Sequence, residues 1–380
     1  MAVRTVRSSI APGRHFLSGA DAIVEGAVTA GCGYFAGYPI TPTTEVLERI
    51  AVRFPEVGAR FMQMEDEIAS VCSCVGASWA GKKAMTVTSG PGFTLMQEGI
   101  GHAVMTEAPL VVIDGQRAGP STGQVTVGAG DVMQARWGMH GGIPTIALSP
   151  WSVQELFDVT IQAFNLAERY RTVVFVMAEA ATMHLQEELE VPAEVELYER
   201  DKAPGQPPFG CDSPDGVPPM PSFGEGEKLL VTASTHDARG FRRTSDPGTE
   251  RVLASRLHNK IMMHAPELVQ VEAHLLDDAD YAFIAYGFTA RSALSAARTL
   301  RGEGVKVGLL RLRTLWPFPQ EAVAALGCRV RGILVPEMNL GQMVHPVAAA
   351  ATCPVVLHPQ MDGTVIYPQP LVESMRRLAS

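Results

Sequence analysis

Four short stretches of the sequence place polar side chains, glycine and proline directly beside apolar runs. They are GYPITPTTE at 37–45, MEDEIAS at 64–70, SGPGF at 89–93 and DGQRAGPSTG at 114–123. In doubly wound α/β proteins, ligands bind where the parallel strands end, so residues that follow an apolar strand are candidates for a site. These stretches are therefore the first places to look for chemistry.

Arg117 follows the apolar run PLVVIDG at 109–115. Arginine is the side chain that holds a carboxylate with two parallel hydrogen bonds. An arginine in a surface loop is the alternative, but its place after a predicted strand favours a role in binding a carboxylate.

Thr41 lies between Pro39 and Pro42. Proline fixes its own φ and disfavours the helical conformation for the residue before it, so this backbone should be extended and stiff. The local pattern alone favours a connector in which Pro42 opens a helix and Thr41 caps its N-terminus. The alternative is that the prolines hold the Thr41 hydroxyl toward a ligand.

Glu65, Asp66 and Glu67 stand at a predicted strand-to-helix junction. The helix dipole favours acidic residues in a first turn, so a solvated cap is the simpler interpretation. The functional alternative is that one carboxylate turns inward and holds a proton on a bound heterocycle. The SGPGF stretch at 89–93 suits either a negative group at a helix N-terminus or a tight turn that needs glycine at positive φ.

Several function classes lose their support. The glycines of GCGYFAG at 31–37 follow a predicted helix and precede a strand, which is the reverse of a dinucleotide-binding fingerprint, and no GxxxxGK[ST] or HExxH motif occurs. The net charge of -9, without a basic cluster, argues against nucleic acid. The six cysteines form no CxxC pair and suit a reducing compartment, and no run is apolar enough to span a membrane, so we expect a cytoplasmic protein.

Alternating predicted strands and helices must position these stretches. The strands read as continuous apolar runs, which is typical of a parallel sheet covered on both faces. One series runs from about residue 18 to 187, and a second series begins with YAFIAYG at 281–287 and includes one long strand at 305–315. We therefore predict an α/β fold with two doubly wound domains, at 1–250 and 270–380, joined by a long connection rich in proline and glycine from about 190.

Taken together with PEMNLGQ at 336–342, the four stretches resemble, in order and spacing, the α subunit of 2-oxoacid:ferredoxin oxidoreductases. The similarity covers nearly the whole chain and is greatest to the 2-oxoglutarate and branched-chain 2-oxoacid enzymes. It implies a pyrimidine-binding domain for thiamine diphosphate followed by a transketolase C-terminal-like domain. It also implies a β subunit that carries the diphosphate site, Mg²⁺ and a [4Fe-4S] cluster, in a heterodimer or an (αβ)2 assembly with the active site at the interface.

The resemblance implies a coenzyme A-dependent oxidative decarboxylation of a 2-oxoacid, first of all 2-oxoglutarate, to acyl-CoA and carbon dioxide with electrons passed to ferredoxin. By match to the family, Glu67 holds ring atom N1′ of thiamine and should be buried beneath the partner chain. The substrate carboxylate would be held by Thr41 and Arg117, with Thr122 as a weaker candidate. The residues expected at the cofactor are Glu67, Pro39, Ile40, Ser89 and Gly90; no metal ligand is expected on this chain.

One loop departs from the family pattern. Where the 2-oxoglutarate-type members carry a Leu-Pro-Thr-Lys-x-Glu-Gln type loop, this chain reads QVTVGAGD at 124–131, and Val127 takes the place of the lysine. Loss of that charge leaves a branched-chain or aromatic 2-oxoacid as an alternative substrate. Two rival interpretations stay open, a thiamine-dependent decarboxylase or transferase without electron transfer and a noncatalytic scaffold. We expect 336–342 to serve domain packing or partner contact.

Overall fold

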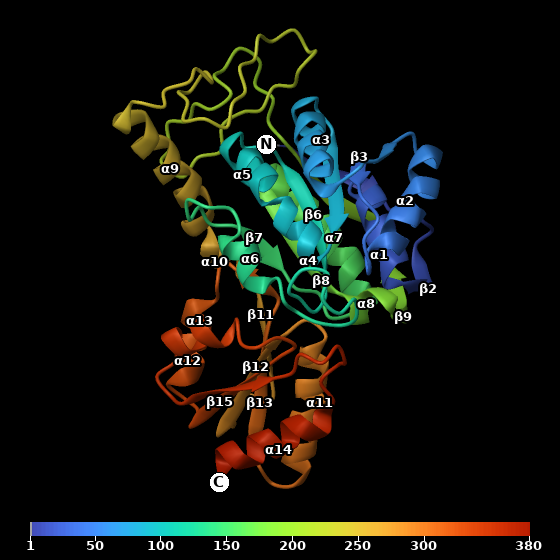
Figure 1. Cartoon of the computed structure of the whole chain (residues 1–380), viewed down its shortest axis with the longest axis vertical. Helices are drawn as coiled ribbons and strands as arrows, with labels where there is room; N and C mark the ends of the chain where they lie inside the picture. Colours follow the sequence, from blue (N-terminus) through green and yellow to red (C-terminus); the bar gives the residue numbers. More distant parts are fainter. Residues whose placement is uncertain (1) are drawn as a thin grey trace.

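The computed structural model describes residues 2–380 and contains two main sheets, of seven and five strands, each with helices on both faces (Figure 1). The strand order of the larger sheet is β14-β7-β8-β6-β5-β3-β4. All its neighbouring pairs are parallel except β14 with β7. Its strands are β3 (Cys32–Gly37), β4 (Arg60–Gln63), β5 (Lys83–Thr88), β6 (Leu110–Gln116), β7 (Ile146–Leu148), β8 (Val173–Glu179) and β14 (Thr314–Trp316).

Two hydrophobic clusters cover the faces of this sheet. One contains α1 (Gly19–Thr29), α2 (Thr44–Glu56) and α7 (Val153–Tyr170). The other contains α3 (Glu67–Trp79), α4 (Gly90–Leu95), α5 (Gln97–Met105) and α6 (Val132–Trp137). The stretch FTLMQEGIGHAVM at 93–105 reads as a single helix in the sequence, but the chain breaks at Met96, which ends α4 and begins α5.

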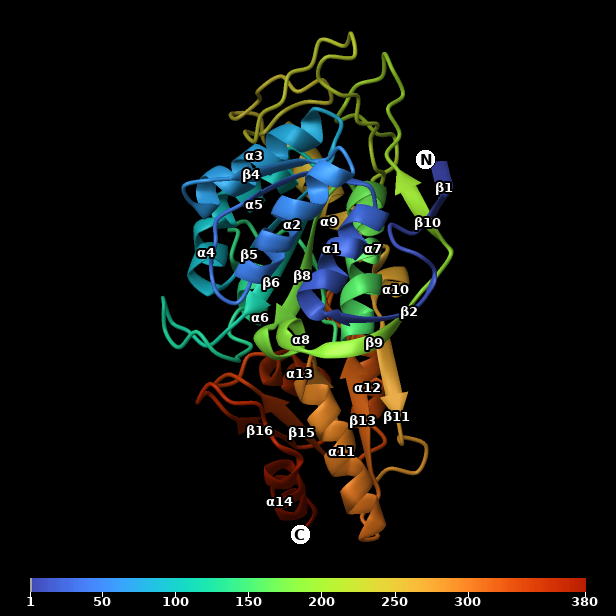
Figure 2. The same ribbon diagram turned by 90° about the vertical axis from the view of Figure 1, so that its right-hand side faces the viewer.

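The segment after the short helix α8 (Ala180–His184) wraps around the first domain. Strands β9 (Gln186–Val191) and β10 (Glu194–Glu199) pair with β2 (Gly13–Ser18) and β1 (Ala2–Arg7) in two small antiparallel sheets. Residues 200–246 then contain no helix or strand within the described chain, before α9 (Pro247–Met262) and α10 (Ala265–Leu268). This irregular stretch lies at the end of the molecule opposite the second domain (Figures 1 and 2).

The smaller sheet has the order β11-β13-β12-β15-β16, and only β11 runs antiparallel to its neighbour. Its strands are β11 (Val271–His274), β12 (Tyr281–Tyr286), β13 (Val307–Leu312), β15 (Gly332–Glu337) and β16 (Val355–Pro359). The helices that accompany it are α11 (Thr289–Gly302), α12 (Gln320–Gly327), α13 (Val344–Ala350) and α14 (Pro368–Ala379). The predicted fold class, α/β with two doubly wound domains, is confirmed.

The strand expected at 305–315 is in fact two strands that belong to different sheets. After β13 the chain turns at Arg313, and β14 adds an antiparallel edge strand to the sheet of the first domain. The two domains are thus connected by backbone hydrogen bonds as well as by side chains.

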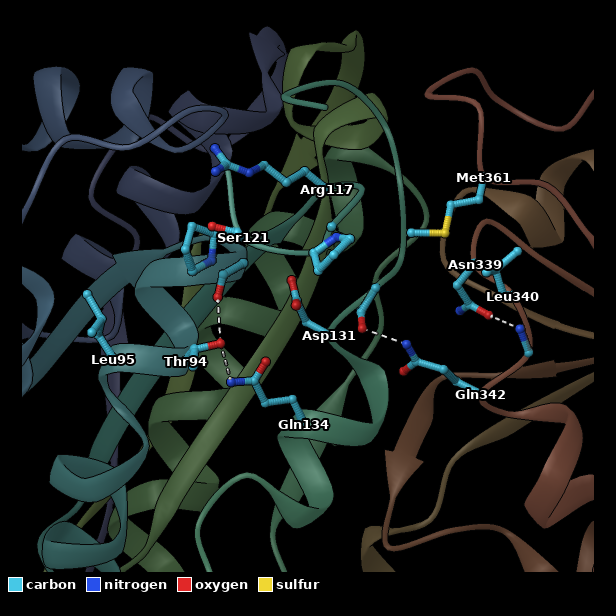
Figure 3. Close-up of a pocket in the computed structure, with 16 residues that line it drawn as sticks. Thr94, Leu95, Arg117, Ser121, Asp131, Gln134, Asn339, Leu340, Gln342 and Met361 are labelled. Atoms are coloured by element: carbon cyan, nitrogen blue, oxygen red, sulfur yellow. Dashed lines mark hydrogen bonds between the residues drawn. The ribbon is translucent and has the colours of Figure 1, made fainter. Parts of the chain in front are cut away.

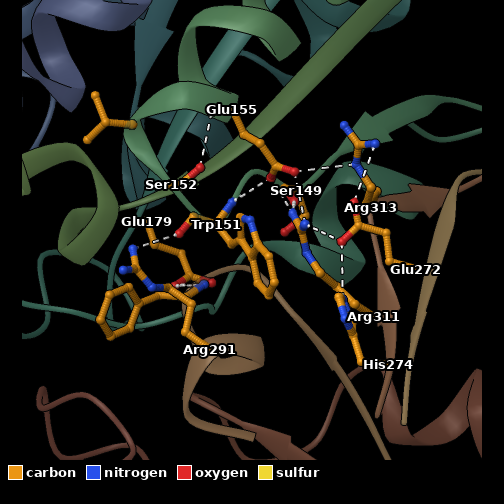
Figure 4. A network of polar contacts seen from close by, with 12 residues as sticks. Ser149, Trp151, Ser152, Glu155, Glu179, Glu272, His274, Arg291, Arg311 and Arg313 are labelled. Atoms are coloured by element: carbon orange, nitrogen blue, oxygen red, sulfur yellow. Dashed lines mark hydrogen bonds and ion pairs between the residues drawn. The ribbon is translucent and has the colours of Figure 1, made fainter. Parts of the chain in front are cut away.

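Buried charges also join the domains (Figure 4). Arg311 of β13 is fully buried, and it donates hydrogen bonds to both carboxylate oxygens of Glu155 on α7 and to Glu272 on β11. Its guanidinium carbon lies 3.8 Å from the ring centroid of Trp151. Because a planar guanidinium can be both ion-paired and stacked, Arg311 fills this junction without an unpaired charge.

No helix of residues 2–380 has the length and apolar character that a membrane span requires.

Candidate active site

A cavity of about 710 Å³ lies between the first domain and the loop that follows β15 (Figure 3). Gly90, Arg117 and Asp131 line it from the first domain, and Asn339 and Gln342 line it from the second. Among the residues that line the cavity, Arg117 is the only basic one and Asp131 the only acidic one. The cavity can therefore hold a small anion at one place, beside Arg117.

Arg117 follows β6 directly and is 4% exposed. Its Nη1 donates a hydrogen bond of 2.7 Å to the carbonyl oxygen of Thr41, while its Nε has no partner among the described residues. Burial lowers the pKa of Arg117, and the nearby carboxylates of Asp131, Asp114 and Glu67 oppose that effect. A desolvated guanidinium with an unused donor is suited to a carboxylate ligand.

Thr41 is exposed, and the helix after it begins at Thr44. Thr43 occupies the cap position, and its hydroxyl donates to the carbonyl of Ile40 at 2.8 Å. The interpretation of Thr41 as the N-cap is therefore wrong. The prolines instead present the Thr41 carbonyl to Arg117, and the structure brings these two predicted site residues together.

Of the two roles considered for the acidic stretch, Asp66 serves as the helix cap and Glu67 supplies the buried carboxyl group. Asp66 is the N-cap of α3 and accepts a hydrogen bond of 2.7 Å from the amide of Ala69. Glu67 begins the helix, is 4% exposed, and has a pKa raised chiefly by burial. Its own chain already buries this carboxyl, so burial does not need the partner chain that we expected.

A glycine makes room for the Glu67 carboxyl. A Cβ atom on Gly92 would lie 2.4 Å from Glu67 Oε1 and 2.4 Å from Thr88 Oγ1, far inside van der Waals contact. The second glycine of SGPGF is therefore required by the close approach of a carboxyl group and a hydroxyl group, a use of glycine that local turn chemistry does not predict.

Of the other predicted site residues, only Gly90 lines the cavity. Ser89 is fully buried and its hydroxyl has no partner among residues 2–380, whereas Gly90, at φ +40°, lines the cavity. Pro39 and Ile40 are half-buried beside Thr41 and do not line the cavity. Thr122 is exposed and also lies outside the lining, where its neighbour Ser121 is found instead.

Sequence reasoning missed a pair of carboxyl groups at the cavity. Asp114 is fully buried near the end of β6, Asp131 is 7% exposed just before α6, and the charge of Asp131 helps to raise the pKa of Asp114. Burial raises the pKa of both carboxyl groups, most strongly for Asp114. The signal in the sequence was an aspartate inside the apolar run LVVID; nothing local pointed to Asp131.

The loop at 124–131 is held by the second domain. Asn339 Nδ2 donates to the carbonyl of Ala129 at 2.7 Å, and Gln342 Nε2 donates to that of Gly130 at 2.6 Å. Glu337 is buried and organises this contact by accepting hydrogen bonds from Asn339 and from three backbone amides at 342–344. The 336–342 stretch thus serves domain packing, one of the two roles expected for it.

Two family models cover most of the chain. Residues 25–254 match the model described as "Pyruvate flavodoxin/ferredoxin oxidoreductase, thiamine diP-bdg". Residues 279–371 match "Pyruvate:ferredoxin oxidoreductase core domain II".

Curated relatives are similar over nearly the same length. The chain is 45% identical over 372 residues to 2-oxoglutarate synthase subunit KorA of Methanothermobacter thermautotrophicus, which covers 96% of this chain and 98% of the relative. It is 48% identical over 336 residues to the KorA subunit of Methanocaldococcus jannaschii, covering 87% and 90%. It is 36% identical over 368 residues to ketoisovalerate oxidoreductase subunit VorB of M. thermautotrophicus, covering 96% and 97%.

Solved structures agree with these similarities. The 2-oxoglutarate:ferredoxin oxidoreductase from Magnetococcus marinus, solved with 2-oxoglutarate, coenzyme A and succinyl-CoA bound, matches with a TM-score of 0.92 at 30% identity. That match covers 97% of this chain and 66% of the solved chain, so this chain spans a little under two thirds of its length. A split gene transketolase shares the fold, with a TM-score of 0.52 at 14% identity. This chain therefore belongs to the 2-oxoacid:ferredoxin oxidoreductase family, as an α subunit of the branch that includes the 2-oxoglutarate synthases and ketoisovalerate oxidoreductases.

Proposed function

We propose that this chain is the α subunit of an enzyme that oxidatively decarboxylates 2-oxoglutarate, with thiamine diphosphate as cofactor, coenzyme A as cosubstrate and ferredoxin as electron acceptor. The observation that carries the proposal is the buried carboxyl of Glu67 close to the buried guanidinium of Arg117. The Glu67 carboxyl suits a protonated heterocycle, and the Arg117 guanidinium suits a carboxylate. The names of the most similar relatives support the choice of 2-oxoglutarate.

The side chains around Glu67 fit the aminopyrimidine ring of thiamine. Glu67 offers a carboxyl group with a raised pKa, and the hydroxyl groups of Thr88 and Ser89 are buried without partners among the described residues. In the proposed role, the Glu67 carboxyl holds a proton at ring atom N1′, while Pro39, Ile40 and Gly90 form the surroundings of the ring. When bound, thiamine diphosphate supplies the carbon nucleophile and the electron sink that decarboxylation of a 2-oxoacid needs.

Arg117 would hold the substrate carboxylate. Its hydrogen bond to the Thr41 carbonyl fixes the guanidinium, and its free Nε leaves a donor for the substrate. Such preorganisation lowers the entropic cost of placing the 2-oxo carbon for attack. In this proposal the hydroxyl of Thr41, an exposed residue, adds a second contact, and Thr122 reaches the substrate only if its loop moves.

A β subunit would complete the site with the diphosphate and Mg²⁺ contacts and the [4Fe-4S] cluster, in a heterodimer or (αβ)2 assembly in the cytoplasm. Exposed apolar side chains in the segments that carry the proposed site support a covering partner. They include Tyr38, Ile68 and Leu95, which are 38%, 49% and 48% exposed. We further propose that residues 1–250 form the thiamine pyrimidine-binding domain and residues 270–380 the transketolase C-terminal-like domain.

The test is anaerobic viologen reduction by the chain co-purified with its native partner, across a panel of 2-oxoacids. We expect reduction with 2-oxoglutarate that requires both thiamine diphosphate and coenzyme A. The proposal would be refuted by a complex that contains both thiamine diphosphate and the cluster but fails to reduce viologen with every 2-oxoacid of the panel.

A branched-chain or aromatic 2-oxoacid is the second candidate substrate. Val127 offers no charge for a second carboxylate, Arg117 is the only basic residue lining the cavity, and the VorB relative is 36% identical. The same panel separates the candidates, because the preferred acid has the higher kcat/KM. A preference for 2-oxoisovalerate over 2-oxoglutarate would replace the first choice and leave the reaction type unchanged.

A further inference from the structure

The segment at 129–133, which brings Asp131 to the cavity, is hydrogen-bonded to the second domain on both sides of that residue. Before Asp131, the carbonyl of Gly130 accepts a hydrogen bond of 2.6 Å from Gln342 Nε2 (Figure 3). After Asp131, the amide of Met133 donates to Gln342 Oε1 at 2.8 Å. The side-chain amide of Gln342 therefore uses both its donor and its acceptor to hold the segment.

Other residues of the second domain hold the same segment. Trp316 of β14 is 5% exposed, and its Nε1 donates to the carbonyl of Val132 at 2.9 Å. The carbonyl of Ala129 accepts from Asn339 Nδ2 at 2.7 Å, and its amide donates to the carbonyl of Met338 at 3.0 Å. Four of the five residues at 129–133 therefore have backbone groups that are bound by the second domain.

The chain just before this segment lies directly against the backbone of Arg117. Val127 pairs with Arg117 in an antiparallel bridge. A Cβ on Gly128 would lie 2.7 Å from the carbonyl carbon of Arg117, and one on Gly130 would lie 3.2 Å from its carbonyl oxygen. Because such close packing transmits displacements, a shift of residues 127–133 would also move Arg117.

Arg117 is thus fixed from two directions. Its Nη1 donates to the carbonyl of Thr41, while its backbone is covered by the segment that Gln342 holds. A guanidinium that must meet a carboxylate through directed hydrogen bonds tolerates little displacement. The position of Arg117 therefore depends on the second domain, although within residues 2–380 its side chain is hydrogen-bonded only to Thr41.

We propose that Gln342 is a positioning residue for substrate binding, which sets the place of Arg117 through the segment at 127–133. The inference rests on the proposed function, in which Arg117 holds the carboxylate of a 2-oxoacid. It gives the second domain a part in substrate affinity in addition to domain packing. Since Gln342 acts on the group that binds the carboxylate and not on the reacting carbon, its loss should weaken binding more than it slows turnover.

The first test measures kcat and KM by viologen reduction in the full complex with its native partner, with the 2-oxoacid that the wild type prefers. Gln342→Met removes both hydrogen bonds at nearly constant side-chain length. The matched control is Gln154→Met on α7, outside the lining of the cavity. Gln154 is equally half-buried, and it likewise donates to the carbonyl of Glu190 at 3.2 Å and accepts from its amide at 2.7 Å.

We expect Gln342→Met to raise KM by about tenfold, since two hydrogen bonds to the backbone are lost. Its kcat and its bound thiamine diphosphate should stay close to those of the wild type, and Gln154→Met should leave KM unchanged. An unchanged KM in Gln342→Met, in a complex whose wild type turns over, would refute the inference alone. A wild-type complex that fails to reduce viologen with every 2-oxoacid would refute the proposed function, and the inference with it.

A double-mutant comparison shows whether Gln342 acts through Arg117. In Arg117→Lys the guanidinium that the segment positions is absent, so the further change Gln342→Met should raise KM by no more than about twofold, because coupled residues are not additive. Equal factors in the two backgrounds would overturn the positioning role and indicate a direct contact between Gln342 and the substrate.

A milder variant keeps the inference testable if Gln342→Met fails to fold. Trp316→Phe removes the single donor to the Val132 carbonyl and retains an aromatic ring. KM should then rise by about two- to fivefold at the same kcat, as expected for one hydrogen bond. An unchanged KM in Trp316→Phe would overturn the inference.

Discussion

At the scale of single residues, the site depends on charged groups that the fold removes from water. Glu67 is 4% exposed and its pKa is raised by burial, whereas its neighbour Glu65 is exposed to solvent. A carboxyl group with a raised pKa keeps its proton more readily than one in water and can exchange it with a bound base. The position of Glu67 at the start of α3, beside Gly92, is what makes the difference between the two glutamates.

Replacement of Glu67 by glutamine tests this role. Glu67→Gln keeps the size of the side chain and its hydrogen-bonding capacity but cannot exchange a proton, so kcat should fall by at least about 100-fold. Thiamine content and assembly with the partner should be unchanged. The measurement is viologen reduction with 2-oxoglutarate, with Glu65→Gln as the matched control; turnover within a few fold of the wild type in Glu67→Gln would disprove the role.

Arg117→Lys keeps the charge at the cavity and removes the planar fork. Because a point charge cannot bond both the Thr41 carbonyl and a carboxylate in the same geometry, kcat/KM should fall by about 10- to 100-fold, mainly through KM. The half-buried Arg136, which lies outside the lining of the cavity, supplies the control as Arg136→Lys. An unchanged KM in Arg117→Lys would contradict the proposed grip on the substrate.

At the scale of elements, the irregular connection between the domains is held by a buried arginine that donates hydrogen bonds to its backbone carbonyl groups. Residues 200–246 form no helix or strand in the described chain, so their carbonyl groups need other partners. Arg171, at the end of α7, donates to the carbonyls of Pro208, Pro218 and Pro219 at 2.7, 3.1 and 2.8 Å. One side chain thereby anchors two parts of the connection to the first domain.

Arg171→Leu should therefore loosen the connection. Loss of a fully buried guanidinium that is hydrogen-bonded to several carbonyls should lower the free energy of unfolding by roughly 3–5 kcal/mol. Limited proteolysis should then cut within 200–228 before the sheets unfold. The control is Arg169→Leu, two residues before Arg171, which breaks only a surface ion pair with Glu267. It should lower the free energy of unfolding by no more than about 1 kcal/mol. Equal losses of stability in the two variants would show that the connection does not depend on Arg171.

At the scale of the whole molecule, the cavity exists because the two domains are held in one arrangement. Strand β14 crosses from the second domain into the first sheet, and Arg311 of the second domain pairs with Glu155 of the first. Glu179 adds a third connection, because this buried carboxyl at the end of β8 accepts a hydrogen bond of 3.1 Å from the amide of Phe288 at the start of α11.

Glu179 should make this arrangement sensitive to pH. Burial raises the pKa of Glu179 to about 8, above its ordinary value of 4.5, so the folded protein prefers the protonated form. The free energy of unfolding is therefore highest below the pKa that Glu179 has in the unfolded chain. It falls as the pH rises toward the pKa of Glu179 in the folded protein, by at most about 1.4 kcal/mol per pH unit. Glu179→Gln should therefore gain stability relative to the wild type between pH 5 and pH 8, as measured by urea unfolding; parallel curves for the two proteins would refute it.

The sequence by itself determined most strands of the two main sheets, because continuous apolar runs and glycine or proline breaks are local properties. It also determined the family, and it pointed to Glu67 and Arg117, since both lie at junctions that an α/β sheet must place at one edge. The structure corrected two elements, the helix that breaks after Leu95 and the strand that divides between two sheets. The second correction has a distant contact as its cause, because β14 pairs with β7 of the first domain.

Only the tertiary structure decided which polar groups meet. Asp114 and Asp131 belong to different elements and form a pair only because the second domain holds the loop at 124–131 in place. The inward turn of Glu67 depends on Gly92 in another helix, and the exposure of Thr122 depends on the path of a loop. Burial and proximity are properties of packing between distant segments, so no pattern within one segment could encode them.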